Sequence, residues 1–171
     1  MDINEIVKKI KAVIAKLKKD KVALKGKVTM IHRDNDGNVL DKTVWTNLIV
    51  DAGLDEVIKL IGGGLTGSKF EYLALGSDNT SPAAWDTALW NEITSNWGSR
   101  VQATVTQETT NTTNDTLRLD NTFDFTGSLT IEEVGVFNDP SAGTMLGRKL
   151  SGTKSVSSGD SLQIIYDIIA S

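Results

Sequence analysis

The sequence predicts a mainly β protein of the α+β kind: an antiparallel β-sandwich with one short internal helix and an amphipathic helix at the N-terminus. In the second half of the chain, short runs alternate apolar and polar residues between turn residues, as half-buried strands do. Over the first twenty residues, apolar side chains instead recur every three or four positions, which is helical spacing. Residues 51–61 form a short amphipathic segment that begins at an Asp and is followed by a Gly, as many helices are.

The composition narrows the possible classes of function. The chain has 171 residues, 39% hydrophobic and 23% charged, which suits one ordinary domain and argues against a disordered or fibrous chain. Its apolar runs are too short to span a membrane, and the first residues lack the layout of a signal peptide. With no Cys and a single His, disulfide scaffolds and thiolate zinc sites are excluded, and catalysis by His is disfavoured. We therefore expect a protein that is not an enzyme and that holds no cofactor or metal.

The N-terminal segment, residues 1–21, is predicted to be an amphipathic helix that serves as an oligomerisation or docking arm. Its apolar residues follow spacings of three and four: Ile3, Ile6, Ile10, Val13 and Leu17. Ile at both positions of such a seam favours coiled coils of three or four strands, so we expect a homotrimer. Two alternatives remain: the stripe packs on its own body, or it docks on another protein.

Charge is distributed unevenly between this arm and the rest of the chain. Residues 1–27 contain nine Lys and three acidic residues, a net charge of +6, and the remainder of the chain carries −10. Such a basic arm could contact nucleic acid or an anionic surface, could be a solvated helix face, or could be attracted to the acidic body of a neighbouring copy. The lysines are not interleaved with aromatic residues, and the acidic body would repel phosphate, so nucleic acid is disfavoured.

Residues 22–171 are predicted to form the sandwich body. A hairpin is expected over residues 22–50, because Asp36-Gly37 lies in a turn between two β-prone runs. The helix at 51–61 is predicted to be capped by Asp51 and to bury an apolar face made by Leu54, Val57, Ile58 and Ile61. One helical turn is expected near 85–93. Strands are expected at 70–75, 101–106, 117–125, 129–137, 144–150 and 162–170, the last in a central position because both its faces are apolar.

Several motifs resemble parts of known catalytic or binding sites but do not match them fully. Gly62-Gly-Gly-Leu-Thr-Gly-Ser-Lys69 has the wrong residue order for a phosphate-binding loop and follows a helix rather than a strand. The carboxylates near apolar segments are expected to form a solvated surface: Glu71, Asp86, Glu92, Glu132 and Glu133. The four tryptophans could make a sugar-binding platform, but in a domain with few other aromatics such residues are more often core or interface anchors; for Trp85 and Trp90 the hypothesis is an interface role.

The order of motifs over residues 51–170 resembles the tail-collar fibre N-terminal domain of tailed phages and related small virion structural proteins. The resemblance rests on the Gly53-Leu54 helix start, Phe70-Glu-Tyr-Leu-Ala-Leu-Gly76, Asp86-Thr-Ala-Leu-Trp-Asn-Glu92 followed by Arg100, Ile131-Glu-Glu-Val-Gly-Val-Phe-Asn138 and Gly143-Thr-Met-Leu146. It implies a non-enzymatic virion protein, present in the host cytoplasm during assembly, that contacts other proteins of the tail, neck or capsid.

This chain departs from that family in two ways. Its family members usually continue into a receptor-binding shaft, whereas this sequence stops at Ser171 and adds residues 1–50. We therefore expect a fibre, adaptor or decoration-type connector that acts through protein–protein contacts. A carbohydrate-binding module for attachment to the host surface is the alternative, and a surface glycan hydrolase is a third class.

Overall fold

The computed structural model describes residues 2–9, 23–62 and 67–171, and their nine strands form one antiparallel sheet. The elements are β1 (Leu24–Arg33), β2 (Val39–Ile49), α2 (Asp51–Ile61), β3 (Tyr72–Gly76), β4 (Val101–Gln102), β5 (Thr104–Glu108), β6 (Thr116–Asp124), β7 (Leu129–Phe137), β8 (Met145–Val156) and β9 (Ser161–Ala170). Their order across the sheet is β4-β3-β7-β8-β2-β1-β9-β6-β5. The prediction of a mainly β, antiparallel protein is confirmed.

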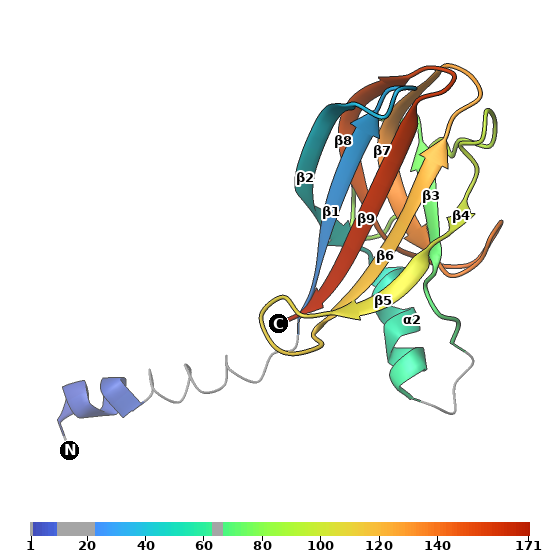
Figure 1. Ribbon diagram of the computed structural model, residues 1–171. Coiled ribbons are helices and arrows are strands. Elements are labelled where there is room, and N and C mark those ends of the chain that lie inside the picture. Colours follow the sequence, from blue (N-terminus) through green and yellow to red (C-terminus); the bar gives the residue numbers. More distant parts are fainter. Residues whose placement is uncertain (1, 10–22, 63–66) are drawn as a thin grey trace.

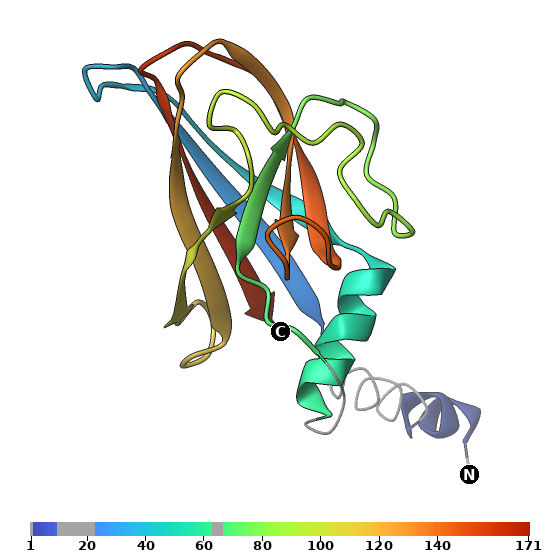
Figure 2. The ribbon, with the colours of Figure 1, turned by 90° about the vertical axis from the view of Figure 1, so that its right-hand side faces the viewer.

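Strand β2 joins the two halves of this sheet. It pairs with β1 over most of its length, and near its end Leu48 and Ile49 pair with Arg148 and Gly147 of β8. The sheet consequently curls, so that β3, β7 and β8 lie opposite β1, β9 and β6 (Figures 1 and 2). The sequence predicted two packed sheets; the structure has two facing layers that are continuous through β2, in a nearly barrel-like arrangement.

The core fills the space between these layers. Its fully buried side chains come from both halves of the sheet and include Met30, Leu73, Leu75, Leu119, Phe123, Ile131, Leu146, Leu162 and Tyr166. The Tyr166 hydroxyl accepts a hydrogen bond from the Asn47 side chain of β2, and burial raises the pKa of this phenol. As the sequence predicted, β9 is central: it pairs with β1 on one side and β6 on the other.

The predicted hairpin between β1 and β2 is also confirmed. The Asp34 carboxylate accepts hydrogen bonds from the backbone N–H groups of Asp36 and Asn38, at 3.0 and 2.8 Å. Gly37 has a φ of 84°, a conformation in which a side chain would be strained. Hydrogen bonds from Asn38 are the main reason that the pKa of Asp34 lies below its ordinary value.

Helix α2 is present where it was predicted, but two expectations about it are wrong. Its N-cap is Val50 rather than Asp51, which is the first helical residue. The predicted apolar face is not buried as a whole: Leu54, Ile58 and Ile61 are 43, 63 and 77% exposed. Only Val57 of that face packs against the core.

The residues that α2 does bury are Gly53 and Glu56. A Cβ atom on Gly53 would lie 2.4 Å from the backbone oxygen of Leu146, so only glycine allows the helix to lie this close to β8. Glu56 Oε1 accepts hydrogen bonds from the Ser68 N–H at 2.7 Å and from Asn138 Nδ2 at 2.9 Å. These inward contacts rotate the apolar residues of the helix toward solvent.

The helical turn expected near residues 85–93 is absent from the structure. The segment near 85–93 has turns and a single bridge between Gly76 and Glu92 instead of a helical turn, because the backbone N–H groups of Trp90 and Asn91 bond to the Glu133 carboxylate.

Residues 3–9 are helical, as predicted. Of the predicted stripe, Ile3 is exposed and Ile6 half-buried, and Ile10, Val13 and Leu17 lie outside the described residues. None of the described helices combines the length and apolarity needed to cross a membrane.

Replacement of Glu56 by Gln tests how α2 is held. The Ser68 N–H, followed by Lys59 and Asn138, holds the pKa of Glu56 below its ordinary value despite the opposing effect of burial. A lowered folded-state pKa stabilises the protein above the unfolded value of about 4.3, and that stability is lost as the pH falls through the folded value. We expect Glu56→Gln to lower the free energy of unfolding at pH 7 and to differ less from the parent as the pH falls below about 4.3. Denaturant titrations at several pH values measure this, with the exposed Asp55→Asn as control; a difference that does not change with pH would contradict it.

Candidate functional site

The connection between β3 and β4, residues 77–100, is held to the outer side of the sheet by a buried arginine. Arg148 of β8 is completely buried. Its Nη1 lies 2.7 Å from Asp86 Oδ2, and its Nη2 lies 2.6 Å from Glu133 Oε2 and donates to the Thr80 carbonyl at 3.0 Å. One guanidinium therefore joins β7, β8 and two points of the connection.

Glu133 is the second buried group of this cluster. Its Oε1 accepts hydrogen bonds from the backbone N–H groups of Trp90 and Asn91, at 3.0 and 3.2 Å. Burial raises the pKa of Glu133, while these N–H groups and Arg148 oppose that shift. A Cβ on Gly76 would lie 2.5 Å from Oε1, which explains the glycine at the end of β3. The expectation of solvated carboxylates is wrong for Asp86 and Glu133, because each is paired with Arg148.

A second arginine holds the far end of the same connection. Arg100 pairs with both carboxylate oxygens of Glu92, at 2.6 and 2.8 Å, and donates to the carbonyls of Asp139 and Ala142. Its guanidinium lies 3.6 Å from the ring centroid of Phe137. Beneath the connection, Leu89 joins a small buried cluster with Val50, Ala74, Phe137 and Met145.

This anchored connection presents three tryptophans to solvent. Trp85, Trp90 and Trp97 are 79, 60 and 74% exposed, whereas Trp45 packs partly against the core. The sequence singled out Trp85 and Trp90 as interface residues and omitted Trp97. Asn96 and Trp97 both have positive φ values, 50° and 64°, which non-glycine residues seldom adopt. Single large apolar groups on a fixed backbone are typical of contact sites.

A second apolar surface lies at the end of the body where α2 is found. A groove of about 470 Å³ runs between α2 and strands β5 and β6. Its apolar lining comes from Leu24, Val57, Leu60, Phe70, Val105, Leu117, Leu146 and Ile168. Val105, Leu117 and Leu60 remain about two fifths exposed, at 40, 37 and 41%. Sequence reasoning missed this groove, since its walls come from segments far apart in the chain.

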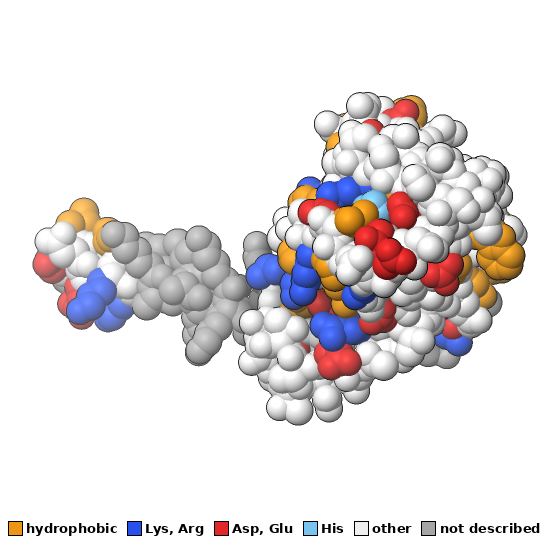
Figure 3. All heavy atoms as spheres, turned by 45° about the horizontal axis from the view of Figure 1, so that its top comes forward, with side chains coloured by type: hydrophobic (Ala, Val, Ile, Leu, Met, Phe, Trp, Pro, Cys, Tyr) orange, Lys and Arg blue, Asp and Glu red, His pale blue; other side chains and the backbone are white. Residues whose placement is uncertain are grey.

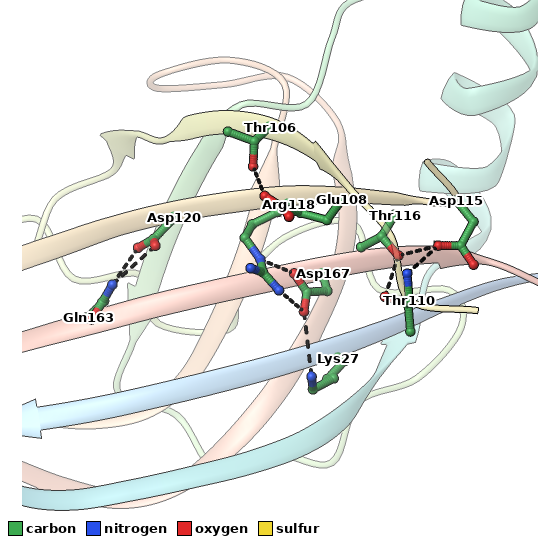
Figure 4. Close-up of polar contacts among 10 residues, drawn as sticks. All are labelled: Lys27, Thr106, Glu108, Thr110, Asp115, Thr116, Arg118, Asp120, Gln163 and Asp167. Carbon is green, nitrogen blue, oxygen red and sulfur yellow. Dashed lines mark hydrogen bonds and ion pairs between the residues drawn. The ribbon is translucent and has the colours of Figure 1, made fainter. Parts of the chain in front are cut away.

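The outer face of β1, β9, β6 and β5 is polar, and many of its charged groups pair with one another (Figure 4). The nearly buried Asp167 accepts two hydrogen bonds from Arg118, at 2.7 and 3.0 Å, and lies 3.7 Å from Lys27 Nζ. Gln163 donates to Asp120 at 2.9 Å. Figure 3 shows basic and acidic side chains close together on the surface in view, with smaller hydrophobic groups among them.

Asp115 organises the loop between β5 and β6. Its carboxylate accepts hydrogen bonds from the backbone N–H groups of Thr110, Asn111 and Thr112, at 2.8 to 2.9 Å. These bonds hold the pKa of Asp115 far below its ordinary value. Within residues 2–9, 23–62 and 67–171, no group of three or more His, Asp or Glu side chains is placed to hold a metal ion.

Replacement of Arg148 by Met tests whether the buried cluster holds the tryptophan connection. The substitution keeps the length of the side chain but leaves two buried carboxylates without their cation, so we expect a loss of about 3–5 kcal/mol of stability. Thermal and denaturant unfolding measure this. Lys149→Met, at the next and only half-buried position of β8, is the matched control and should change stability little. Equal stability of the two variants would show that the cluster does not anchor the connection.

The sequence comparisons support a phage fibre origin. Residues 56–169 match the family described as podophage GP4 fiber I protein gp80; the match runs from the middle of α2 into β9 and covers about two thirds of the chain. No curated protein and no solved structure matches. The match supports the fibre-type resemblance but is to a different family from the tail-collar domain. The chain belongs to the podophage GP4 fiber I protein gp80 family of phage fibre proteins.

Proposed function

We propose that this fibre-family protein is a connector of the virion, an adaptor or decoration protein similar to the tail-collar fibre domains, that acts by assembly and without catalysis. The exposed tryptophans on a rigidly anchored connection carry this proposal. Trp85 lies next to Asp86, which Arg148 holds, and the backbone N–H of Trp90 is held by Glu133, so both would bind a neighbouring virion protein at little cost in conformational entropy. The partners would be tail, neck or capsid proteins, met in the host cytoplasm during assembly.

We further propose that the N-terminal arm makes the protein a homotrimer. Ile3 and Val7 are 72 and 44% exposed on the helical residues 3–9, so this helix has apolar side chains that a neighbour could cover. A helix of this length gains most of its stability from packing its apolar face. Ile at both seam positions favours three or four strands, of which we propose three by analogy with fibres, and closed symmetry makes a finite assembly.

Polar substitutions on the stripe test this self-association in the full chain. We expect Ile6→Gln/Val13→Gln to convert a trimer into a monomer, because two apolar positions of the interface become polar. Light scattering gives the mass, and circular dichroism shows whether the body stays folded. Lys8→Gln/Lys16→Gln, two substitutions away from the stripe, should leave the mass unchanged. A parent chain that is already monomeric would contradict the proposal.

Binding of a glycan is a second candidate function, favoured by one hollow in the surface. A depression of about 540 Å³ is lined by Trp97, Asn96, Ser99, Arg100 and Thr126. An exposed aromatic ring beside polar side chains is suited to the apolar face and hydroxyl groups of a sugar. This combination of an aromatic ring and polar groups lies at Trp97, whereas Trp85 and Trp90 are the tryptophans that the sequence singled out for binding.

Titration with oligosaccharides of bacterial lipopolysaccharide tests this alternative. We expect Trp97→Ala to weaken binding at least about tenfold, which corresponds to about 1.4 kcal/mol. The control is Trp85→Ala, which removes an equally exposed tryptophan outside the depression. Calorimetry on the parent and both variants measures the affinities; equal losses in both variants, or no binding by the parent, would count against a glycan site at Trp97.

A further inference from the structure

The groove between α2 and strands β5 and β6 has the character of a binding site for an amphipathic helix. Ile168 and Phe70 are nearly buried and form its base, and Leu60, Val105 and Leu117 are only partly covered. Helix recognition by a protein groove usually depends on such an apolar trough, into which side chains spaced by three and four residues insert. The N-terminal stripe has this spacing, beginning with Ile3, Ile6 and Ile10.

Charge also favours the N-terminal segment as the occupant. The arm, residues 1–21, contains seven Lys and three acidic residues, a net charge of +4, and residues 22–171 carry −8. Glu71, Asp115 and Lys69 line the groove, and Lys69 pairs with Glu71, so the net charge at the groove itself is small. An approaching arm with seven lysines would be attracted to the acidic body as a whole, whereas a second acidic surface would be repelled.

The course of the chain favours a groove on another copy. Ala23 and Ser171 exchange two backbone hydrogen bonds of 2.9 Å, so the chain is still extended along the direction of β1 when it reaches Ala23. Leu24, the next residue, lines the groove. Residues 18–22 contain neither Gly nor Pro, the residues that most often reverse a chain. To enter the groove of its own body the arm would have to reverse direction within these residues, whereas binding to a neighbouring copy needs no such reversal.

We propose that the groove formed by α2, β5 and β6 receives the N-terminal amphipathic segment of a neighbouring copy of this chain. Each copy gives one arm and accepts one, which is a head-to-tail contact that closes into a ring, for example of three. The inference rests on the proposed self-association and identifies its receiving surface: the arm binds a body rather than another arm.

A charge introduced into the groove tests the proposal in the full chain. Val105→Lys places a cation where the Lys-rich arm would bind, and Val44→Lys is the matched control, a half-exposed valine on β2 outside the groove. We expect the subunit dissociation constant of Val105→Lys to rise at least about a hundredfold and that of Val44→Lys to stay within about twofold. If Val105→Lys keeps its mass while Ile6→Gln/Val13→Gln becomes monomeric, the arms bind one another: the proposed self-association stands and the groove inference fails. If both keep their mass, both proposals fail.

Disulfide trapping gives a second readout that does not depend on a destabilising charge. The chain contains no Cys, so Ile10→Cys/Leu117→Cys introduces the only two thiols. Oxidation followed by non-reducing electrophoresis should give covalent multimers, whereas the control Ile10→Cys/Val44→Cys should stay largely monomeric. An internal disulfide would show that each arm occupies the groove of its own body, and failure to cross-link would exclude the groove as its binding place; either result overturns the proposal.

Discussion

The burial of Arg148 together with Asp86 and Glu133 is the constraint on which the arrangement of the connection between β3 and β4 depends. A charge removed from water is costly unless it is paired, and buried Arg148 has two partners: Glu133 of β7 and Asp86, which the connection brings to it. Once that pair forms, Glu133 still has an oxygen to satisfy, and the N–H groups of Trp90 and Asn91 supply the donors. The irregular segment is thus fixed by polar contacts on its inner side. This fixation explains how three tryptophans can stay exposed without collapsing onto the body.

The motifs that gave the resemblance to phage fibre domains have a common physical role in the structure. Most of them secure this one connection: Leu89 packs beneath it, Glu92 pairs with Arg100, and Arg100 lies over Phe137. Gly135 belongs to the same arrangement, because a Cβ atom there would lie 2.9 Å from the Leu89 side chain. Residues that lie about fifty positions apart in the sequence therefore hold the same connection in place.

Local patterns in the sequence were sufficient for most of the strands, because period-two alternation follows directly from one wet and one buried face. The β1–β2 hairpin was predictable for the same reason, as its turn is stabilised within five residues by Asp34. The orientation of α2 was not, since it is decided by Leu146 and Asn138, which are distant in sequence. Trp85 and Trp90 were predicted as interface residues because large aromatics suit interfaces, and the structure shows both exposed, whereas the groove required knowledge of which strands meet. The buried acids had one usable signal: Glu133 lies two residues from Ile131 and directly before the apolar end of its strand, residues 134–137.

The pairing of β1 with β9 has a consequence for how the protein is made. Leu24 faces Ala170 in the sheet, so β1 lacks its partner on that side until β9, the last of the described strands in sequence order, has been synthesised. Until β9 arrives, β1 and β6 each have an unsatisfied edge, and contacts between segments so far apart in sequence form slowly. The arm precedes β1, so it is synthesised before the body can close. In the arrangement proposed above, the groove lacks Ile168 until β9 is in place, so a subunit can receive an arm only after that strand has joined the sheet.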